Sequence, residues 1–111
     1  MELKEKKEGD VVILYPKGYL MGGPETVVVE KRIRQLAEEE NKKLVINLEE
    51  TNHLNSTALG VLIAGYTNYA KRNASMKLCK ADKKIHNIFV ITKLSLVFEV
   101  FETEKEAVAS F

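Results

Sequence analysis

The sequence has little cysteine and no excess of charge of either sign. Its single cysteine, Cys79, cannot form an intrachain disulfide or a multi-cysteine zinc site, and this usage is typical of a reducing compartment. Lys and Arg number 17 while Asp and Glu number 16, which leaves a net charge of +1. A dedicated nucleic-acid-binding surface would need a larger basic excess. We therefore expect a cytoplasmic protein without a direct nucleic-acid partner.

Long hydrophobic runs are also missing. The longest stretch without a charged side chain covers residues 51–70, and several polar residues interrupt it. A bilayer core tolerates such residues poorly. Residues 1–8 are charged from the second position onward and lack the apolar segment of a secretory signal. The sequence predicts neither a membrane span nor a membrane partner.

Length and composition fit one folded domain covering residues 1–111. The chain is 45% hydrophobic and 30% charged, which lies in the range of globular proteins and outside that of disordered chains. A length of 111 residues favours one domain over two. No repeat, low-complexity tract or linker divides the chain.

Several short apolar or alternating segments are typical of strands. Residues 11–15 form a run rich in β-branched side chains, and residues 44–48 form a second run that we expect at the sheet centre. Residues 76–81 alternate between apolar and polar side chains, as a half-solvated strand does. Residues 96–101 are a further strand candidate, with the alternative that part of this segment caps the preceding helix. Leu3 indicates a weaker edge strand before the first run.

Segments with apolar residues at three- and four-residue spacing predict helices between these strands. Pro24, followed by an acidic residue, suits the first turn of a helix that runs to about residue 40. A second helix runs from about 54 to 73, a third covers 85–92, and Thr103 with Glu106 has the capping-box pattern of a short terminal helix. On the second helix we expect one apolar face that comprises Leu59, Leu62, Ile63, Tyr66 and Ala70. The alternation of strands and helices predicts an α/β fold with a mixed sheet.

The junction Asn55-Ser56-Thr57, between the central strand and the second helix, is the segment best suited to a function. Ligand-contacting residues gather at such junctions in α/β sheets. One interpretation is that one of these side chains caps the helix, a role worth about 1 kcal/mol. Another is that a hydroxyl in the first helical turn accepts a phosphate, whose charge the N-terminal end of the helix dipole tolerates. The two interpretations are compatible.

Residues that could support catalysis are few and scattered. Cys79 lies in an alternating strand, His53 in a loop and His86 on a helix, and no metal-ligand spacing joins them. No glycine-rich phosphate loop of the dinucleotide or Walker type is present. We expect a protein that is not an enzyme and that binds no metal or cofactor. An enzyme that uses Cys79 as a nucleophile is the least favoured alternative.

Several landmarks carry a family resemblance over nearly the whole chain. Residues 55–60 read Asn-Ser-Thr-Ala-Leu-Gly, residues 18–20 read Gly-Tyr-Leu, and residues 92–94 read Thr-Lys-Leu. A closing strand at residues 98–101 precedes an acidic helix that contains Glu106-Ala107. The sequence thereby resembles the STAS domains of bacterial anti-sigma factor antagonists. That family has Asp-Ser-Ser/Thr-Gly-Leu-Gly, Gly-x-Leu and Thr-Gly-Leu at the corresponding places.

The resemblance implies a single domain with a mixed four- to five-stranded sheet and about four helices packed on it. It also implies a partner-switching role in the regulation of transcription. The unphosphorylated domain would bind an anti-sigma factor that is also a serine kinase, and thereby free a sigma factor, whereas phosphorylation would separate the pair. The serine that matches the family's phosphoacceptor is Ser56, with Thr57 as the second choice. The free protein is expected to be a monomer.

Three positions carry uncharged residues where the family commonly has Asp, namely Met21, Asn47 and Asn55. Ala58 also replaces the family's glycine, a change that a helix accepts readily. The hydroxyl acceptor therefore remains while the acidic character around it is reduced. An alternative function follows, in which the domain is a constitutive STAS scaffold whose hydroxyl is never modified and serves as a helix cap.

A partner is expected to dock on the loop at residues 16–23 and on the first turns of the second helix. A phosphate there would have to lose its hydration or meet acidic groups of the partner, and both effects oppose binding. The residues expected to contact the partner are Leu20, Met21, Gly22, Asn55, Ser56, Thr57, Ala58 and Leu59. Leu20 and Met21 would supply apolar anchors, although core packing is the favoured use of Leu20.

Overall fold

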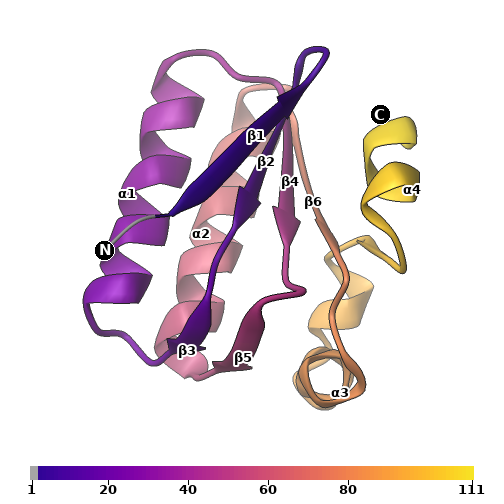
Figure 1. The fold of residues 1–111 in the computed structure, drawn as a ribbon. Coiled ribbons are helices and arrows are strands. Elements are labelled where there is room, and N and C mark those ends of the chain that lie inside the picture. Colours follow the sequence, from indigo (N-terminus) through magenta and orange to yellow (C-terminus); the bar gives the residue numbers. More distant parts are fainter. Residues whose placement is uncertain (1–2) are drawn as a thin grey trace.

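Strands and helices alternate along the chain in the computed structural model, which describes residues 3–111 (Figure 1). This order confirms the α/β class, and the edge strand expected near Leu3 begins at the next residue. In chain order the elements are β1 (Lys4–Glu8), β2 (Val11–Tyr15), β3 (Gly18–Leu20), α1 (Pro24–Glu38), β4 (Lys43–Asn47), β5 (Thr51–Leu54), α2 (Ser56–Lys71), β6 (Ser75–Cys79), α3 (Lys83–Ile91), the 3₁₀ helix η1 (Leu94–Leu96), β7 (Val100–Phe101) and α4 (Glu104–Ala109).

Five strands form the main sheet in the order β1-β2-β4-β6-β7. β1 is antiparallel to β2, and the other neighbours are parallel. The mixed sheet is therefore confirmed, and β4 lies at its centre as predicted. Parallel strands are covered on both faces, which explains why β2 and β4 are continuous apolar runs rather than alternating ones.

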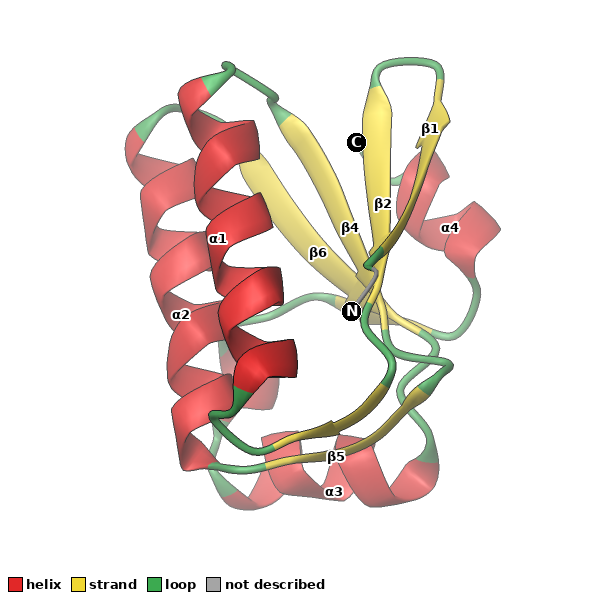
Figure 2. Ribbon diagram, turned by 60° about the vertical axis from the view of Figure 1, so that its left-hand side comes forward, coloured by secondary structure: helices red, strands yellow, loops and turns green. Residues whose placement is uncertain are grey.

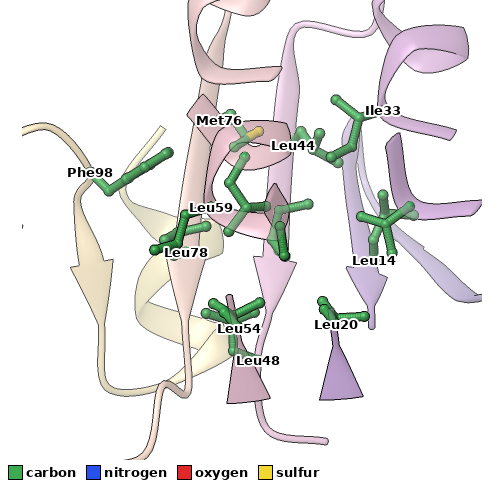
Figure 3. Close-up of a cluster of buried hydrophobic side chains, with 14 of the residues drawn as sticks. Leu14, Leu20, Ile33, Leu44, Leu48, Leu54, Leu59, Met76, Leu78 and Phe98 are labelled. Carbon is green, nitrogen blue, oxygen red and sulfur yellow. The ribbon is translucent and has the colours of Figure 1, made fainter. Parts of the chain in front are cut away.

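Helices cover both faces of the main sheet. α1 and α2 lie side by side on one face, and α4 lies on the other (Figure 2). Side chains of β4 alternate between these layers. Leu44 and Ile46 pack in the larger core with residues of α1 and α2, whereas Val45 packs in the smaller core with Cys79 and Ala107. Figure 3 shows part of the larger core.

Both faces of β6 are buried, which corrects the prediction of a half-solvated strand. Its lysine, Lys77, reaches the end of α4. The Lys77 ammonium donates hydrogen bonds to the carbonyl and hydroxyl oxygens of Ser110, at 3.1 and 2.9 Å. It also lies over the rings of Phe101 and Phe111, at 5.7 and 4.7 Å from their centroids. These contacts replace water around the charge, so the polar position does not mark a solvent-facing side.

α1 begins at Pro24 as predicted and ends at Glu38, two residues earlier than expected. Proline suits the first helical position because its missing N–H would have no partner there. Neither α1 nor any other helix within residues 3–111 is long and apolar enough to cross a bilayer.

α2 starts at Ser56, later than predicted, and its buried face agrees only in part with the prediction: Leu59 and Leu62 are buried and Tyr66 packs partly buried against the core. Its buried residues are Ala58, Leu59, Leu62, Gly65 and Tyr69. Ile63 and Ala70, which were expected on the core face, are exposed. Gly65 lies on that face because the core packs closely there. A Cβ at this position would lie only 2.9 Å from Ile33 Cγ2 and 3.2 Å from Met76 Sδ.

A second, unpredicted sheet consists of β3 and β5, which pair in parallel (Figure 2). Leu20 and Leu54 face each other in its register and are both buried (Figure 3). The Thr51 hydroxyl donates a hydrogen bond to the Pro16 carbonyl at 2.8 Å. Strands of three and four residues with polar side chains give little apolar pattern, so the sequence does not indicate them.

The C-terminal part agrees with the predicted helices and only partly with the predicted strand. α3 covers Lys83–Ile91, and the capping box between Thr103 and Glu106 is confirmed at α4. Of residues 96–101 only the last two form a strand, because the segment before them turns through η1.

Glu104, the first residue of α4, joins this helix to three strands. Its carboxylate accepts hydrogen bonds from the Tyr15 hydroxyl at 2.6 Å, the Asn47 amide at 3.0 Å and the Lys6 ammonium at 3.3 Å. Burial raises the pKa of this carboxyl group, but the three hydrogen bonds outweigh burial and hold the pKa below its ordinary value. The ionised carboxylate is therefore part of the folded structure.

Gly65→Ala is expected to lower the free energy of unfolding, whereas Gly60→Ala is expected to raise it. No heavy atom lies within 4 Å of a Cβ built at position 60. Alanine there gains about 0.5–1 kcal/mol from reduced backbone entropy loss. At position 65 alanine has the same entropic gain, but its methyl group overpacks the core, which costs about 1–3 kcal/mol and outweighs that gain. Urea denaturation measures both variants, and equal stability would contradict the close packing around Gly65.

Glu104→Gln is expected to lower the stability at pH 7 by about 1–2 kcal/mol, because charge-assisted hydrogen bonds are lost. The folded pKa of Glu104 lies below its ordinary value of 4.5. The contribution of the carboxylate is therefore present above that value and is lost as the pH falls through the folded pKa. The difference between wild type and Glu104→Gln, measured by urea denaturation across the pH range, should shrink in acid. A constant difference would contradict this role.

Candidate functional site

The start of α2 is held by Asn55, which is its N-cap residue. The Asn55 side-chain oxygen accepts a hydrogen bond from the Ala58 backbone N–H at 3.0 Å. Its own backbone N–H donates to the Leu20 carbonyl at 3.2 Å, which fixes the helix start to β3. Among the three capping candidates in the sequence, the cap is therefore Asn55. Ser56 is the first residue of the helix, and its side chain is exposed.

The loop after β3 lies against Thr57. Gly22 has a φ of +88°, and a Cβ built there would lie 3.2 Å from Thr57 Cγ2. The Gly22 N–H donates a hydrogen bond to the hydroxyl of buried Thr26 at 2.9 Å, which holds the loop on α1. Thr57 is exposed but borders this loop, whereas the Ser56 hydroxyl lies at the helix tip. Both hydroxyl-bearing residues are therefore exposed at the start of α2, and Thr57 is the one that borders the loop.

Three of the expected partner-contacting side chains are buried. Burial confirms the favoured core packing of Leu20 and the core-facing place of Leu59, and it corrects the expected surface position of Ala58. Leu20, Ala58 and Leu59 are 2%, 2% and 7% exposed. Leu20 faces the core from β3, and the other two lie on the core face of α2. Their side chains are therefore committed to packing and cannot serve as anchors for a partner.

Met21 and Tyr19 are the exposed apolar side chains beside the site, with 50% and 63% of their surface accessible. Met21 was expected there, but Tyr19 was not. The missed signal is strand alternation, because a buried residue at position 20 places its neighbours on the opposite side. The candidate site is thus a surface made by Tyr19, Met21, Gly22, Ser56 and Thr57.

Asn47 does not belong to this surface, which corrects its expected place beside the serine. It is 2% exposed, and its amide donates to Glu104 on α4. Its side-chain oxygen accepts a hydrogen bond from the Glu49 N–H at 2.9 Å. Position 47 thus serves the α4 layer, whereas Met21 and Asn55 remain as uncharged positions near Ser56.

Cys79 is fully buried beneath α4, and the two histidines lie elsewhere. Burial, with a smaller effect of the Glu104 carboxylate, raises the pKa of the Cys79 thiol to about 12. A thiol in this state is a poor nucleophile. His53 is half-buried on β5 with its Nδ1 atom unbonded, and His86 is exposed on α3. Within the described residues, no group of three or more His, Cys, Asp or Glu side chains is placed to hold a metal ion.

These features define a small α/β domain whose candidate site is a surface at the start of a helix. The chain belongs to the STAS domain family, whose model matches residues 2–107. This confirms the family resemblance and the fold that it implied.

Several solved structures share this fold. One is a protein from Thermotoga maritima with 20% identity and a TM-score of 0.89, covering 96% of this chain and 92% of that one. Another is an anti-sigma factor antagonist from Mycobacterium paratuberculosis with 19% identity and a TM-score of 0.82, covering 98% and 92%. The antagonist SpoIIAA matches in its unphosphorylated form with 13% identity and a TM-score of 0.77, covering 97% and 96%. The phosphorylated Bacillus SpoIIAA matches with 14% identity and a TM-score of 0.76, covering 97% of each chain.

Asn55→Asp and Asn47→Asp each restore the acid that is common in the family. We expect Asn55→Asp to raise the free energy of unfolding and Asn47→Asp to lower it. A carboxylate at position 55 can still cap α2 and interacts favourably with the helix dipole, which adds about 0.3–1 kcal/mol. A carboxylate at position 47 would face the Glu104 Oε1 atom, to which the amide donates at 3.0 Å. Repulsion and the lost donor should lower the stability by about 1–3 kcal/mol at pH 7.

Urea denaturation of both variants measures these changes. Because protonation of one carboxyl removes the repulsion, the deficit of Asn47→Asp should shrink as the pH is lowered toward 4. A similar loss of stability in the two variants would contradict the placement of Asn47 and Asn55 in different environments.

Proposed function

We propose that this chain is an anti-sigma factor antagonist that binds an anti-sigma factor with serine kinase activity and is released by phosphorylation of Ser56. The observation that carries the proposal is the division of roles at the start of α2. Asn55 caps the helix, so the exposed hydroxyl of Ser56 is not needed as the cap. Membership of the STAS family and the antagonists among the structures of similar fold support the same role.

A phosphate on Ser56 is compatible with the folded domain. It would add a charge of about −1.5 to −2 in the first turn of α2, where free backbone N–H groups and the helix dipole favour an anion. SpoIIAA in its unphosphorylated and phosphorylated forms matches this fold almost equally well. This supports a switch that changes the charge of the surface and leaves the fold intact.

The docking surface follows from the position of the acceptor. A kinase must bring Ser56 to its own active site, so the exposed groups around this serine come into contact with it. Tyr19 and Met21 offer exposed apolar contact area there, and Gly22 lies close against Thr57. Docking would remove water from a phosphate on Ser56, which opposes binding.

Uncharged residues at positions 21 and 55 fit this switch as well as acidic ones. They add no negative charge beside the unphosphorylated serine. A phosphate on Ser56 would therefore make the surface at the start of α2 much more negative. The absence of the family's acidic residues at these two positions is also the observation that favours the alternative function. In that alternative the domain is a constitutive STAS scaffold without a modified hydroxyl.

Ser56→Asp is expected to reduce partner binding at least tenfold, because its carboxylate mimics part of the phosphate charge. Thr67→Asp is the matched control, since it adds the same charge at an exposed position of α2 about 16 Å further along the helix. Affinity capture from native lysate, with mass spectrometry of bound proteins, compares wild type and both variants. Circular dichroism verifies that all three are folded.

Capture of one serine kinase of the anti-sigma type by wild type and Thr67→Asp, but not by Ser56→Asp, supports the switch. Incubation of the captured kinase with ATP and wild type should then label Ser56, as shown by phosphopeptide mapping, and Ser56→Ala should remain unlabelled. Equal capture of another protein by wild type and Ser56→Asp would overturn the switch and favour the constitutive scaffold.

A further inference from the structure

Four exposed aliphatic side chains gather where α3 ends and η1 begins. They are Val90, Ile91, Leu96 and Val97, with exposures of 50%, 80%, 83% and 42%, and we call them the α3–η1 patch. η1 packs directly against α3, so the two pairs of side chains share one corner of the molecule. The core does not need them, because Ile85 and Phe89 anchor the helix from its other face. Exposed apolar groups gathered in this way mark an interaction surface.

Charge is segregated around this patch. Residues 83–98 contain three of the 17 basic side chains of the chain and none of its 16 acidic ones. Lys83 and Lys84 lie on the exposed face of α3, seven residues and about 10 Å before Val90 and Ile91. Lys93 is exposed between the two halves of the patch.

Each of the two acidic residues that flank this segment has a polar partner. The Asp82 carboxylate caps α3 by accepting a hydrogen bond from the Ile85 N–H at 2.8 Å. Glu99 lies 3.6 Å from the Lys77 ammonium. Asp82 keeps its charge in that cap, and together with the lysines at positions 83, 84 and 93 it leaves residues 82–98 with a net charge of +2. The corner therefore has a positive potential.

An anionic lipid surface matches this corner better than a second copy of the chain or another protein does. A two-fold contact between copies would bring like-charged lysines together. Protein interfaces obtain most of their energy from Trp, Tyr and Arg held in pockets. The patch has none of these side chains, and none of its four residues lines the hollows along α1.

We propose that the α3–η1 patch is a peripheral membrane-binding surface. Its aliphatic side chains enter the boundary between headgroups and acyl chains, and the three lysines contact anionic headgroups. The sequence predicts no membrane partner because it has no spanning segment, but interfacial binding requires only a small exposed patch with a basic rim. This surface lies on other elements than Ser56, so it operates independently of the proposed phosphorylation.

Vesicle co-sedimentation of the purified chain tests this proposal. Wild type at low salt should pellet with vesicles of phosphatidylcholine that contain about one-third phosphatidylglycerol, and not with pure phosphatidylcholine. Ile91→Ser combined with Leu96→Ser should weaken this binding at least tenfold. Lys83→Gln combined with Lys84→Gln should weaken it roughly 25-fold, about fivefold for each lysine. Binding of wild type should also decrease as salt is added.

Val27→Ser is the matched control, because Val27 is an exposed aliphatic residue of α1 outside the patch. It should bind the anionic vesicles as wild type does, and so should Ser56→Asp. No binding of wild type to anionic vesicles at low salt would overturn the proposal, as would equal binding by Ile91→Ser/Leu96→Ser. Self-association in sedimentation that this double variant abolishes, without vesicle binding, would assign the patch to a contact between copies instead. Circular dichroism confirms folding of each variant.

Discussion

Burial of a parallel sheet on both faces is the constraint on which the rest of the structure depends. β2, β4, β6 and β7 are parallel, so each connection must cross the sheet. α1 and α2 make two of these crossings and cover the same face (Figure 2). The other face is left to α4, a helix of only six residues. Such a short helix buries little apolar surface by itself.

Polar contacts compensate for the small area of the α4 layer. At its start, Glu104 accepts hydrogen bonds from three elements of the sheet, and at its end Lys77 binds Ser110. Both charged groups would be costly if they were buried without partners. Their partners make the position of α4 specific, because a displaced helix would leave a carboxylate and an ammonium without them. This explains why the face of β6 toward α4 can carry a lysine.

The same parallel arrangement determines where the candidate site lies. After β2 and β4 the chain continues into β3 and β5, which pair with each other rather than with the main sheet. Asn55 then links the end of this small sheet to the start of α2 through its backbone and its side chain. Ser56 is thereby held at a fixed, exposed position. α3 packs against β5 as well, and its far end carries the apolar, basic corner formed by the α3–η1 patch and its lysines. The domain thus presents two surfaces of different chemistry on one rigid support.

The sequence by itself determined the α/β class, the central place of β4 and most of the helices and strands, because apolar periodicity and capping patterns are local properties of the chain. The choice of Ser56 came from the family resemblance and stays a prediction. The sequence did not determine the exposure of β6, the full extent of the buried face of α2, the β3–β5 pairing or the cap among three adjacent polar residues. Ala58 and Asn47 were misplaced for the same reason. Which side of an element is covered depends on segments far away in the chain. α4 covers Asn47 and Lys77, and Ile33 of α1 packs against Gly65. Only the tertiary structure brings these segments together, so only it decided which polar residues are structural and which remain available on the surface.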